Sequence, residues 1–322
     1  MTDETDPAGN EPEAGRVSGV SPDSTNHPVL GALWMTAAMT SFTVMVVLIR
    51  IISDRLTAFD VAFYRALVGI ALTLPFLLRG GLGEGLILLK TTRYGLYVAR
   101  GLFTYLALVA YVYAVGHMIL VDAIALNSTI PLFTVVLATL VLREKVGPRR
   151  WLATMAGFTG ALIILRPGLV EIGLPAILAL ASAACYGVTG IVVKILSRTE
   201  PAVRIVFYTN LLLALFAIGP ALIFGNPPGW GEALPLLGIG ATANFAHFCM
   251  IRAFSAADAS FVAPFDFVRL ILVTFAGYFL FGETSSPWVW VGAVVIFASA
   301  IIITRIEARR GRNAHPKSAP RY

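Results

Sequence analysis

Charged residues are scarce in this chain. They make up 13% of its 322 residues, whereas apolar residues make up 57% and the mean hydropathy is +0.81. A soluble globular chain is about one quarter charged, so the composition argues against a soluble fold. Apolar stretches of about 20 residues, enough to cross a hydrocarbon core, recur from Leu30 almost to Arg305. We therefore predict an all-α integral membrane protein.

Motifs for catalysis and metal binding are also missing. The two cysteines, Cys185 and Cys249, each lie in an apolar stretch without a second cysteine nearby. The sequence contains no HExxH, no GxSxG and no glycine-rich phosphate loop. We expect no metal, no cofactor and no enzyme activity. A membrane-embedded enzyme or lipid-handling protein without a recognisable catalytic motif remains the alternative.

The basic residues do not form a nucleic-acid-binding pattern, although the formal net charge is +6. They lie in short linkers and in the last seventeen residues, without a basic helix. Residues 1–28 are acidic and lack the basic start of a signal peptide, so we predict a disordered acidic cytoplasmic tail. Residues 306–322 are predicted to be a basic cytoplasmic tail. The expected partners are a small-molecule substrate and the lipid bilayer, not nucleic acid, and a homodimer stays open.

Apolar runs between charged or Pro- and Gly-rich breaks predict ten transmembrane helices. They lie near residues 30–52, 58–78, 95–115, 119–142, 150–166, 173–195, 203–224, 232–254, 259–281 and 287–305.

The positive charges predict the orientation of these helices, because Lys and Arg near span ends stay on the cytoplasmic side. Linkers after even-numbered spans hold most of them: Arg79, Lys90, Arg93, Arg143, Lys145, Arg149, Arg150, Lys194, Arg198 and Arg252. Linkers after odd-numbered spans hold only Arg50, Arg55 and Arg166. We therefore expect a multi-pass protein of a bacterial inner membrane with both termini in the cytoplasm.

The two halves of the chain resemble each other. A shift of 144 residues places Arg50 on Lys194 and Phe63-Tyr64 on Phe207-Tyr208. A shift of 139 residues aligns three further pairs: Glu144 with Glu283, Trp151 with Trp290, and Arg166 with Arg305. Each unit has five spans, an odd number, so the second unit enters the membrane inverted. Such inverted repeats are typical of secondary transporters, whose substrate site lies between the repeats near the midplane.

The order of motifs resembles the EamA-type family of the drug/metabolite transporter superfamily. The motifs are Phe63-Tyr64-Arg65 in span two, Leu142-Arg143-Glu144 before Trp151, and Phe281-Gly282-Glu283 after span nine. The resemblance implies two EamA-like repeats of five helices, residues 29–167 and 168–305, and transport by alternating access. Members carry amino acids, nucleosides, vitamins, S-adenosylmethionine or drugs, so the substrate does not follow from the fold.

One departure from the family pattern concerns the proline of span nine. Pro131 precedes Glu144 by thirteen residues, but the equivalent position in the second half is Leu270, and the proline is displaced to Pro264. We expect a helix break at Asn127–Thr129, before Pro131, and a break at another depth in span nine.

Ionisable and polar residues inside spans are the candidate substrate-binding residues, because burying charge in a membrane is costly. Asp266 and Arg269 share one helical face at i, i+3, and Arg65 has the uncharged repeat partner Thr209. The polar and aromatic candidates are Asn127, Asn244, Tyr186 and Tyr208. A structural ion pair, interhelical packing and interfacial anchoring are the competing interpretations.

Two further roles follow from position. Glu144 and Glu283 lie at span ends on opposite sides of the membrane and are predicted gate or helix-end residues. Asp266 and His247 are the candidates for proton coupling, although exchange or facilitated transport stays open. We expect the substrate to be a small polar or charged metabolite, amino-acid-, vitamin- or nucleoside-like, with a carboxylate or zwitterionic group. Arg100 is expected to reach lipid headgroups.

Single cysteines in a cysteine-free background test the predicted orientation. Ser21→Cys should be protected from a membrane-impermeant thiol reagent added outside, whereas Ser286→Cys should react, because it follows an odd-numbered span. The reverse labelling pattern would refute the topology.

Overall fold

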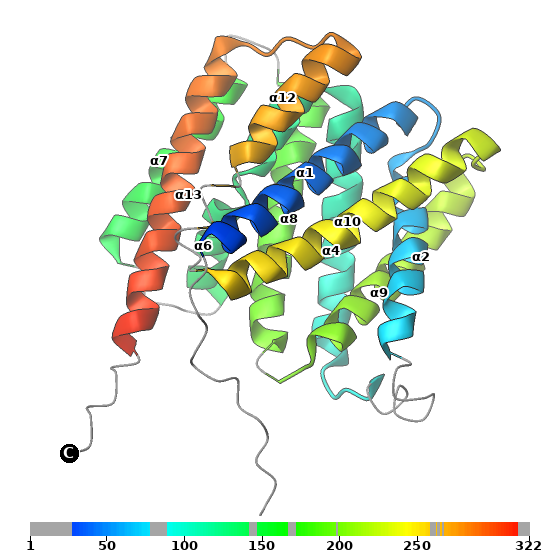
Figure 1. The fold of residues 1–322 in the computed structure, drawn as a ribbon, viewed down its shortest axis with the longest axis horizontal. Coiled ribbons are helices and arrows are strands. Elements are labelled where there is room, and N and C mark those ends of the chain that lie inside the picture. The colour runs from blue at the N-terminus through cyan, green and yellow to red at the C-terminus, as the bar shows by residue number, and fades with distance from the viewer. Residues whose placement is uncertain are drawn as a thin grey trace, which may run out of the picture.

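The structure is a computed structural model that describes residues 28–77, 89–141, 147–166, 172–197, 199–257, 262, 265 and 267–314. Its described elements are all helical (Figure 1). The first half contains α1 (Pro28–Ile52), α2 (Ala58–Leu77), α4 (Tyr94–His117), α5 (Leu120–Asn127), α6 (Ile130–Val141) and α7 (Pro148–Leu165). The second half contains α8 (Leu174–Leu196), α9 (Ala202–Phe224), α10 (Trp230–Ala256), α12 (Phe267–Phe281) and α13 (Pro287–Ala314).

Each of the ten predicted spans has a helical counterpart. In the described part of the chain, eight stretches are long and apolar enough to cross a membrane. Span five corresponds to α7, and span nine to the shorter apolar helix α12. The last predicted span, residues 287–305, agrees with the membrane-length stretch Pro287–Ile306, and helix α13 continues beyond it to Ala314.

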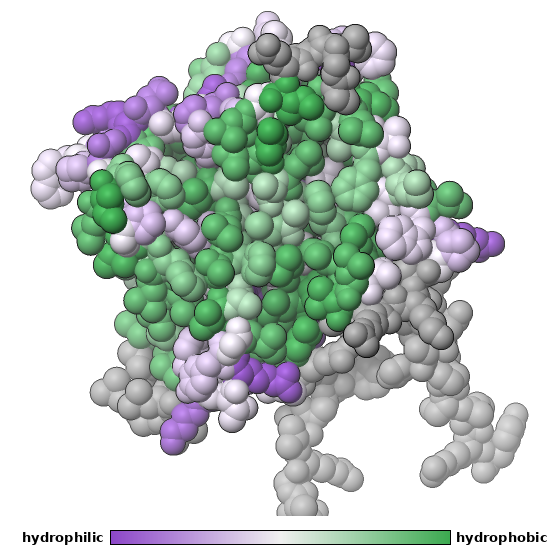
Figure 2. All heavy atoms as spheres, turned by 180° about the vertical axis from the view of Figure 1, so that it is seen from behind, coloured by the Kyte–Doolittle hydropathy of each residue, from purple (hydrophilic) through white to green (hydrophobic). Residues whose placement is uncertain are grey.

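The surface fits a lipid environment. Large apolar side chains are exposed along the helices, including Leu222, Ile223, Leu234 and Phe279 at 73–80%. On the face shown in Figure 2, apolar residues cover the middle and hydrophilic residues lie mainly towards the edges. Soluble monomers rarely expose an apolar surface of this extent, so this surface is suited to contact with lipid.

The fourth span is broken, as its proline predicts. Helix α5 stops at Asn127, and α6 starts at Ile130, one residue before Pro131. In the break, the hydroxyls of Ser128 and Thr129 donate to the carbonyls of Ile124 and Leu126 at 2.9 and 2.7 Å. Both carbonyls also accept from the backbone N–H groups of Ser128 and Thr129, so the hydroxyls add hydrogen bonds within the broken segment. The corresponding Pro264 of span nine lies outside the described residues.

The two halves of the bundle are interlocked. Helix α1 packs along α10, α4 along α8, α2 against α9, and α7 against α13 (Figure 1). Exchanging the halves converts the α1–α10 contact into the α8–α4 contact and maps the other two contacts onto themselves. The packing therefore has the symmetry expected of an inverted repeat. The bundle has two ends: the Glu283 end, where α1, α4, α7 and α12 finish, and the opposite Glu200 end, where α8 finishes.

Close packing of α7 on α13 depends on glycine. A Cβ atom placed on Gly160 would lie 2.7 Å from the carbonyl oxygen of Gly292, and one on Gly292 would lie 2.5 Å from that of Gly160. Small residues at helix crossings allow such close backbone approach in membranes.

Gly160→Ala should therefore destabilise the bundle by about 1–3 kcal/mol, the usual cost of overpacking. Thermal unfolding of the detergent-solubilised protein would show a lower midpoint. Gly219→Ala is the matched control, because no atom lies within 4 Å of its added Cβ, and its midpoint should stay equal or rise. Equal midpoints for the two variants would contradict the proposed tight crossing.

Candidate functional site

Arginine and aromatic side chains from six helices meet in the interior of the bundle. We call this group the arginine–aromatic cluster. It comprises Phe42 of α1, Arg65 of α2, Tyr111 of α4, Tyr186 of α8, His247 of α10 and Arg269 of α12. Three members come from each repeat, so the cluster lies between them.

Arg269 is the most closely held member of the cluster. Its Nη2 donates to the hydroxyl of Tyr111. Its guanidinium carbon lies 5.4 Å from the ring centre of Phe42 and 5.9 Å from that of Tyr111, within range of cation–π attraction. Its Nε is buried and has no hydrogen-bond partner among the described residues. The guanidinium therefore retains an unused donor.

Arg65 and His247 complete the polar part of the cluster. The guanidinium of Arg65 lies within hydrogen-bonding range of the Tyr186 side chain and acts electrostatically on Tyr111 and His247. His247 Nδ1 donates to the carbonyl of Ala243 at 2.7 Å, which leaves Nε2 as the acceptor of a neutral imidazole. The ring of His247 packs edge-on against Phe42, with centroids 5.3 Å apart.

This arrangement suits an electron-rich planar group. Two permanent cations supply hydrogen-bond donors, and four aromatic rings supply flat faces. Among the described residues, no carboxylate forms an ion pair with Arg65 or Arg269. A ligand with carbonyl or anionic acceptors would satisfy donors that the protein leaves open.

The remaining polar candidates lie in different places. The amide of Asn127 donates to Ser182 Oγ at 3.3 Å, one helical turn before Tyr186 on α8, so it adjoins the cluster. The amide of Asn244 donates to the carbonyl of Gly240 in its own helix at 2.8 Å. Tyr208 donates to the carbonyl of Leu89 at 2.9 Å and packs on Tyr97, with ring centroids 4.7 Å apart. No described contact joins Asn244 or Tyr208 to the cluster. Asp266 and Glu144 lie outside the described residues.

Sequence reasoning missed Tyr111 and Phe42. Tyr111 lies about two turns from the end of α4 and is easily taken for an interfacial anchor, and a phenylalanine within a span carries no signal. The expectation for Arg100 is not supported, because its Nε and Nη1 are buried without a described partner. Arg100 acts electrostatically on His247 and so places a third cation beside the cluster.

Glu283 joins the repeats at its end of the bundle. Its Oε1 pairs with Nη2 of Arg50 at 2.9 Å, and its Oε2 accepts from the backbone N–H of Leu120, the first residue of α5, at 2.8 Å. Arg50 Nη1 also donates to the carbonyls of Val115 and Gly116 at 2.8 and 2.6 Å. One ion pair therefore binds the ends of α1 and α4 to the start of α5.

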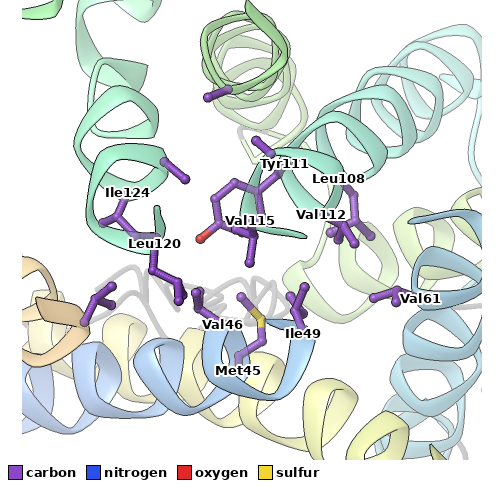
Figure 3. Packing of buried hydrophobic residues seen from close by; sticks show 14 of the residues in the cluster. Met45, Val46, Ile49, Val61, Leu108, Tyr111, Val112, Val115, Leu120 and Ile124 are labelled. Carbon is purple, nitrogen blue, oxygen red and sulfur yellow. The ribbon is translucent and has the colours of Figure 1, made fainter. Parts of the chain in front are cut away.

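An apolar layer lies between this ion pair and the arginine–aromatic cluster. Side chains of Val46 and Ile49 from α1 point towards Val115 of α4 and Leu120 of α5 (Figure 3). All four are fully buried. The described side chains thus close the Glu283 end with apolar packing beneath a bonded ion pair.

A second polar network lies at the opposite end, outside the spans. Glu200, between α8 and α9, accepts hydrogen bonds from Arg204, from Thr91 at 2.9 Å and from Tyr97 at 3.2 Å. Burial favours a raised pKa for Glu200, but the hydrogen bonds from Arg204 and Thr91 outweigh it and lower the pKa.

An interlocked inverted repeat of apolar helices with a cationic aromatic cluster between its halves defines the class of secondary membrane transporters. The comparison with protein families identifies the particular family. The EamA-like transporter family matches residues 29–166 and again residues 173–305. The chain belongs to this family, and the double match corresponds to the two repeats.

Individual relatives span nearly the whole chain. A riboflavin transporter of Rhizobium johnstonii is 35% identical, over 89% of this chain and 95% of its own length. A riboflavin transporter of Vibrio cholerae is 33% identical, over 89% and 97%. An S-adenosylmethionine uptake transporter of Rickettsia prowazekii is 26% identical, over 88% and 96%. A solved crystal structure at 17% identity shares the fold, with a TM-score of 0.58 over 87% of this chain and 98% of its own.

The Glu200 network predicts a pH-dependent contribution to stability. A carboxylate with a lowered pKa stabilises the fold above its ordinary pKa, about 4.3, and loses that contribution as pH falls through the folded-state value. Glu200→Gln should therefore lower the thermal midpoint at pH 7, and the difference from wild type should shrink below about pH 4. A difference that stays constant from pH 7 to pH 3.5 would contradict this prediction.

Proposed function

We propose that this protein is a secondary transporter that carries riboflavin, or a closely similar planar vitamin, across the bacterial inner membrane by alternating access. The observation that carries the proposal is the placement of Arg65 and Arg269 against Tyr111 and Tyr186 between the repeats. Transport needs no catalytic step, and we propose none.

The two substrates named for the relatives, riboflavin and S-adenosylmethionine, differ in charge. Arg65 and Arg269 remain in net excess even when Asp266 is counted as ionised. S-adenosylmethionine carries a sulfonium, an ammonium and one carboxylate, so it is a net cation, and two arginines in this site would disfavour it. Riboflavin is neutral, and its ring carbonyls accept hydrogen bonds. The site charge and the higher identity to riboflavin transporters favour the same substrate.

The geometry supports binding of different parts of riboflavin by different members of the cluster. The guanidinium of Arg269 offers its free Nε to a ring carbonyl, which fits a neutral dione as well as the carboxylate expected from sequence. The rings of Phe42, Tyr111 and Tyr186 provide stacking faces for the tricyclic ring system. The Asn127–Ser182 pair, one turn away on α8, provides hydrogen-bonding groups for the ribityl hydroxyls.

We also propose the orientation that the positive charges favour. The tails, residues 1–28 and 306–322, lie in the cytoplasm, and the Glu283 end of the bundle faces outside. The repeats, residues 29–167 and 168–305, each supply half of the site. The substrate and lipid are the partners, and nucleic acid is not.

Riboflavin should stabilise the purified protein, and Arg269→Ala should weaken that binding by roughly 10- to 100-fold, because a charge-assisted hydrogen bond contributes about 1.5–3 kcal/mol. Riboflavin at a hundred times its Kd should add about 2.7 kcal/mol of stability, visible as a raised thermal midpoint. Quenching of flavin fluorescence gives the Kd directly. Stabilisation by S-adenosylmethionine and not by riboflavin would overturn the substrate while leaving the transporter family intact.

Two controls make the result specific. Arg252→Ala removes an exposed arginine of α10 that packs on Phe248, outside the cluster, and should leave the riboflavin Kd unchanged. Asp266→Asn combined with Arg269→Gln removes both charges together. If that double variant transports riboflavin normally in proteoliposomes, the two residues are structural and do not bind the substrate.

A further inference from the structure

Asp122 lies at the start of α5 but makes no described hydrogen bond to the backbone of that helix. It lies in the first turn of α5, where a carboxylate normally accepts backbone N–H bonds. The N-cap residue Ile119 offers no side-chain cap, and the N–H of Leu120 donates to Glu283 from the other repeat. Oδ1 of Asp122 is buried and has no hydrogen-bond partner among the described residues. The start of α5 is thus capped by a distant residue, while Oδ1 of its own carboxylate has no described partner.

Two polar groups near Asp122 also lack described hydrogen-bond partners. Glu283 and Ser285 face it from the α12–α13 link, and Arg166 faces it from the end of α7. Nε of Arg166 and Oγ of Ser285 are also buried without a described hydrogen-bond partner. Arg50 of α1 belongs to the same end, but Glu283 and the carbonyls at the end of α4 occupy its guanidinium. No charge from α4 or α8 is among the described groups that act on Asp122.

Two physical effects favour the neutral acid in this arrangement. Burial of Oδ1 removes hydration, and this loss costs a carboxylate more than it costs a carboxylic acid. Glu283 pairs with Arg50, and a second negative charge beside this carboxylate is unfavourable. Arg166 and Ser285 act in the opposite sense, because a cation and a hydroxyl donor both stabilise the carboxylate.

We propose that Asp122 is a proton-binding site that controls the Glu283 end of the bundle: it holds a proton while this end is closed and releases it to water when this end opens. Opening separates the α12–α13 link from α5, which hydrates the carboxylate and removes its neighbour Glu283. Acid on this side of the membrane therefore favours the closed arrangement. The inference is independent of the substrate, because it concerns only the closing of one end.

A distance measurement across the Glu283 end tests the proposal without substrate. Spin labels are attached through Asp54→Cys and Thr284→Cys, both exposed at this end, in protein whose Cys185 and Cys249 have been replaced. In otherwise wild-type protein the ratio of short to long distances should rise at least about fivefold from pH 8 to pH 5, as for typical linkage between two sites. Asp122→Asn should show the short distance at both pH values, because its amide is permanently neutral.

Two variants give the result its specificity. Asp122→Glu keeps a titratable group and should keep a pH response, which separates proton binding from misfolding. Asp60→Asn removes another acid of the same end, one bonded to Thr57 and to the N–H of Asn226, and should respond like wild type. A wild-type pH response in Asp122→Asn would overturn the proposal. So would loss of the response in Asp60→Asn, or no response in the wild type.

Discussion

A charged group inside a membrane has to find its partners within the protein, and in this chain several of those partners lie across the repeat boundary. Arg50 of the first repeat pairs with Glu283 of the second, Arg269 of the second donates to Tyr111 of the first, and Arg65 lies against Tyr186. Hydrophobic association between helices is weak in lipid, so these contacts and the glycine crossing of α7 on α13 specify how the halves fit together. The same contacts create the site, because they bring cations and rings from both halves to one place.

Long-range pairing explains which features the sequence could predict. Apolar runs locate the helices because the span length is imposed by the bilayer, and Pro131 locates the break between α5 and α6 because it lacks an N–H. Arg65 and Arg269 were recognisable as candidates because charge in a span is costly. Tyr111 was not, since a tyrosine near a helix end is ordinary until its partner is known, and its partner lies 158 residues away. The Arg50–Glu283 pair joins residues 233 positions apart, which no local pattern reveals.

The charges of the bundle are arranged in layers. Arg269 and Arg65 lie in the interior among rings, whereas the described ion pairs lie at the ends of the bundle. The apolar layer of Val46, Ile49, Val115 and Leu120 separates the interior cations from the acids of the Glu283 end. Attraction falls with distance, and a carboxylate beyond this layer is a poor counterion for Arg269. The interior cations thus remain available for a ligand that arrives between the repeats.

The duplication also relates the two ends of the bundle. Arg50 corresponds to Lys194 and Glu283 to Glu144, so the chain carries both members of the ion pair twice, once in each orientation. If the halves exchange conformations during alternating access, the residue types that close one end are present to close the other. The acid beside the pair is different, because at the shift of 139 residues that aligns Glu144 with Glu283 the position of Asp122 corresponds to Phe261, which carries no charge. Proton control of the kind proposed for Asp122 would therefore act on the Glu283 end alone, and it would give an otherwise symmetric cycle a dependence on the pH of one side.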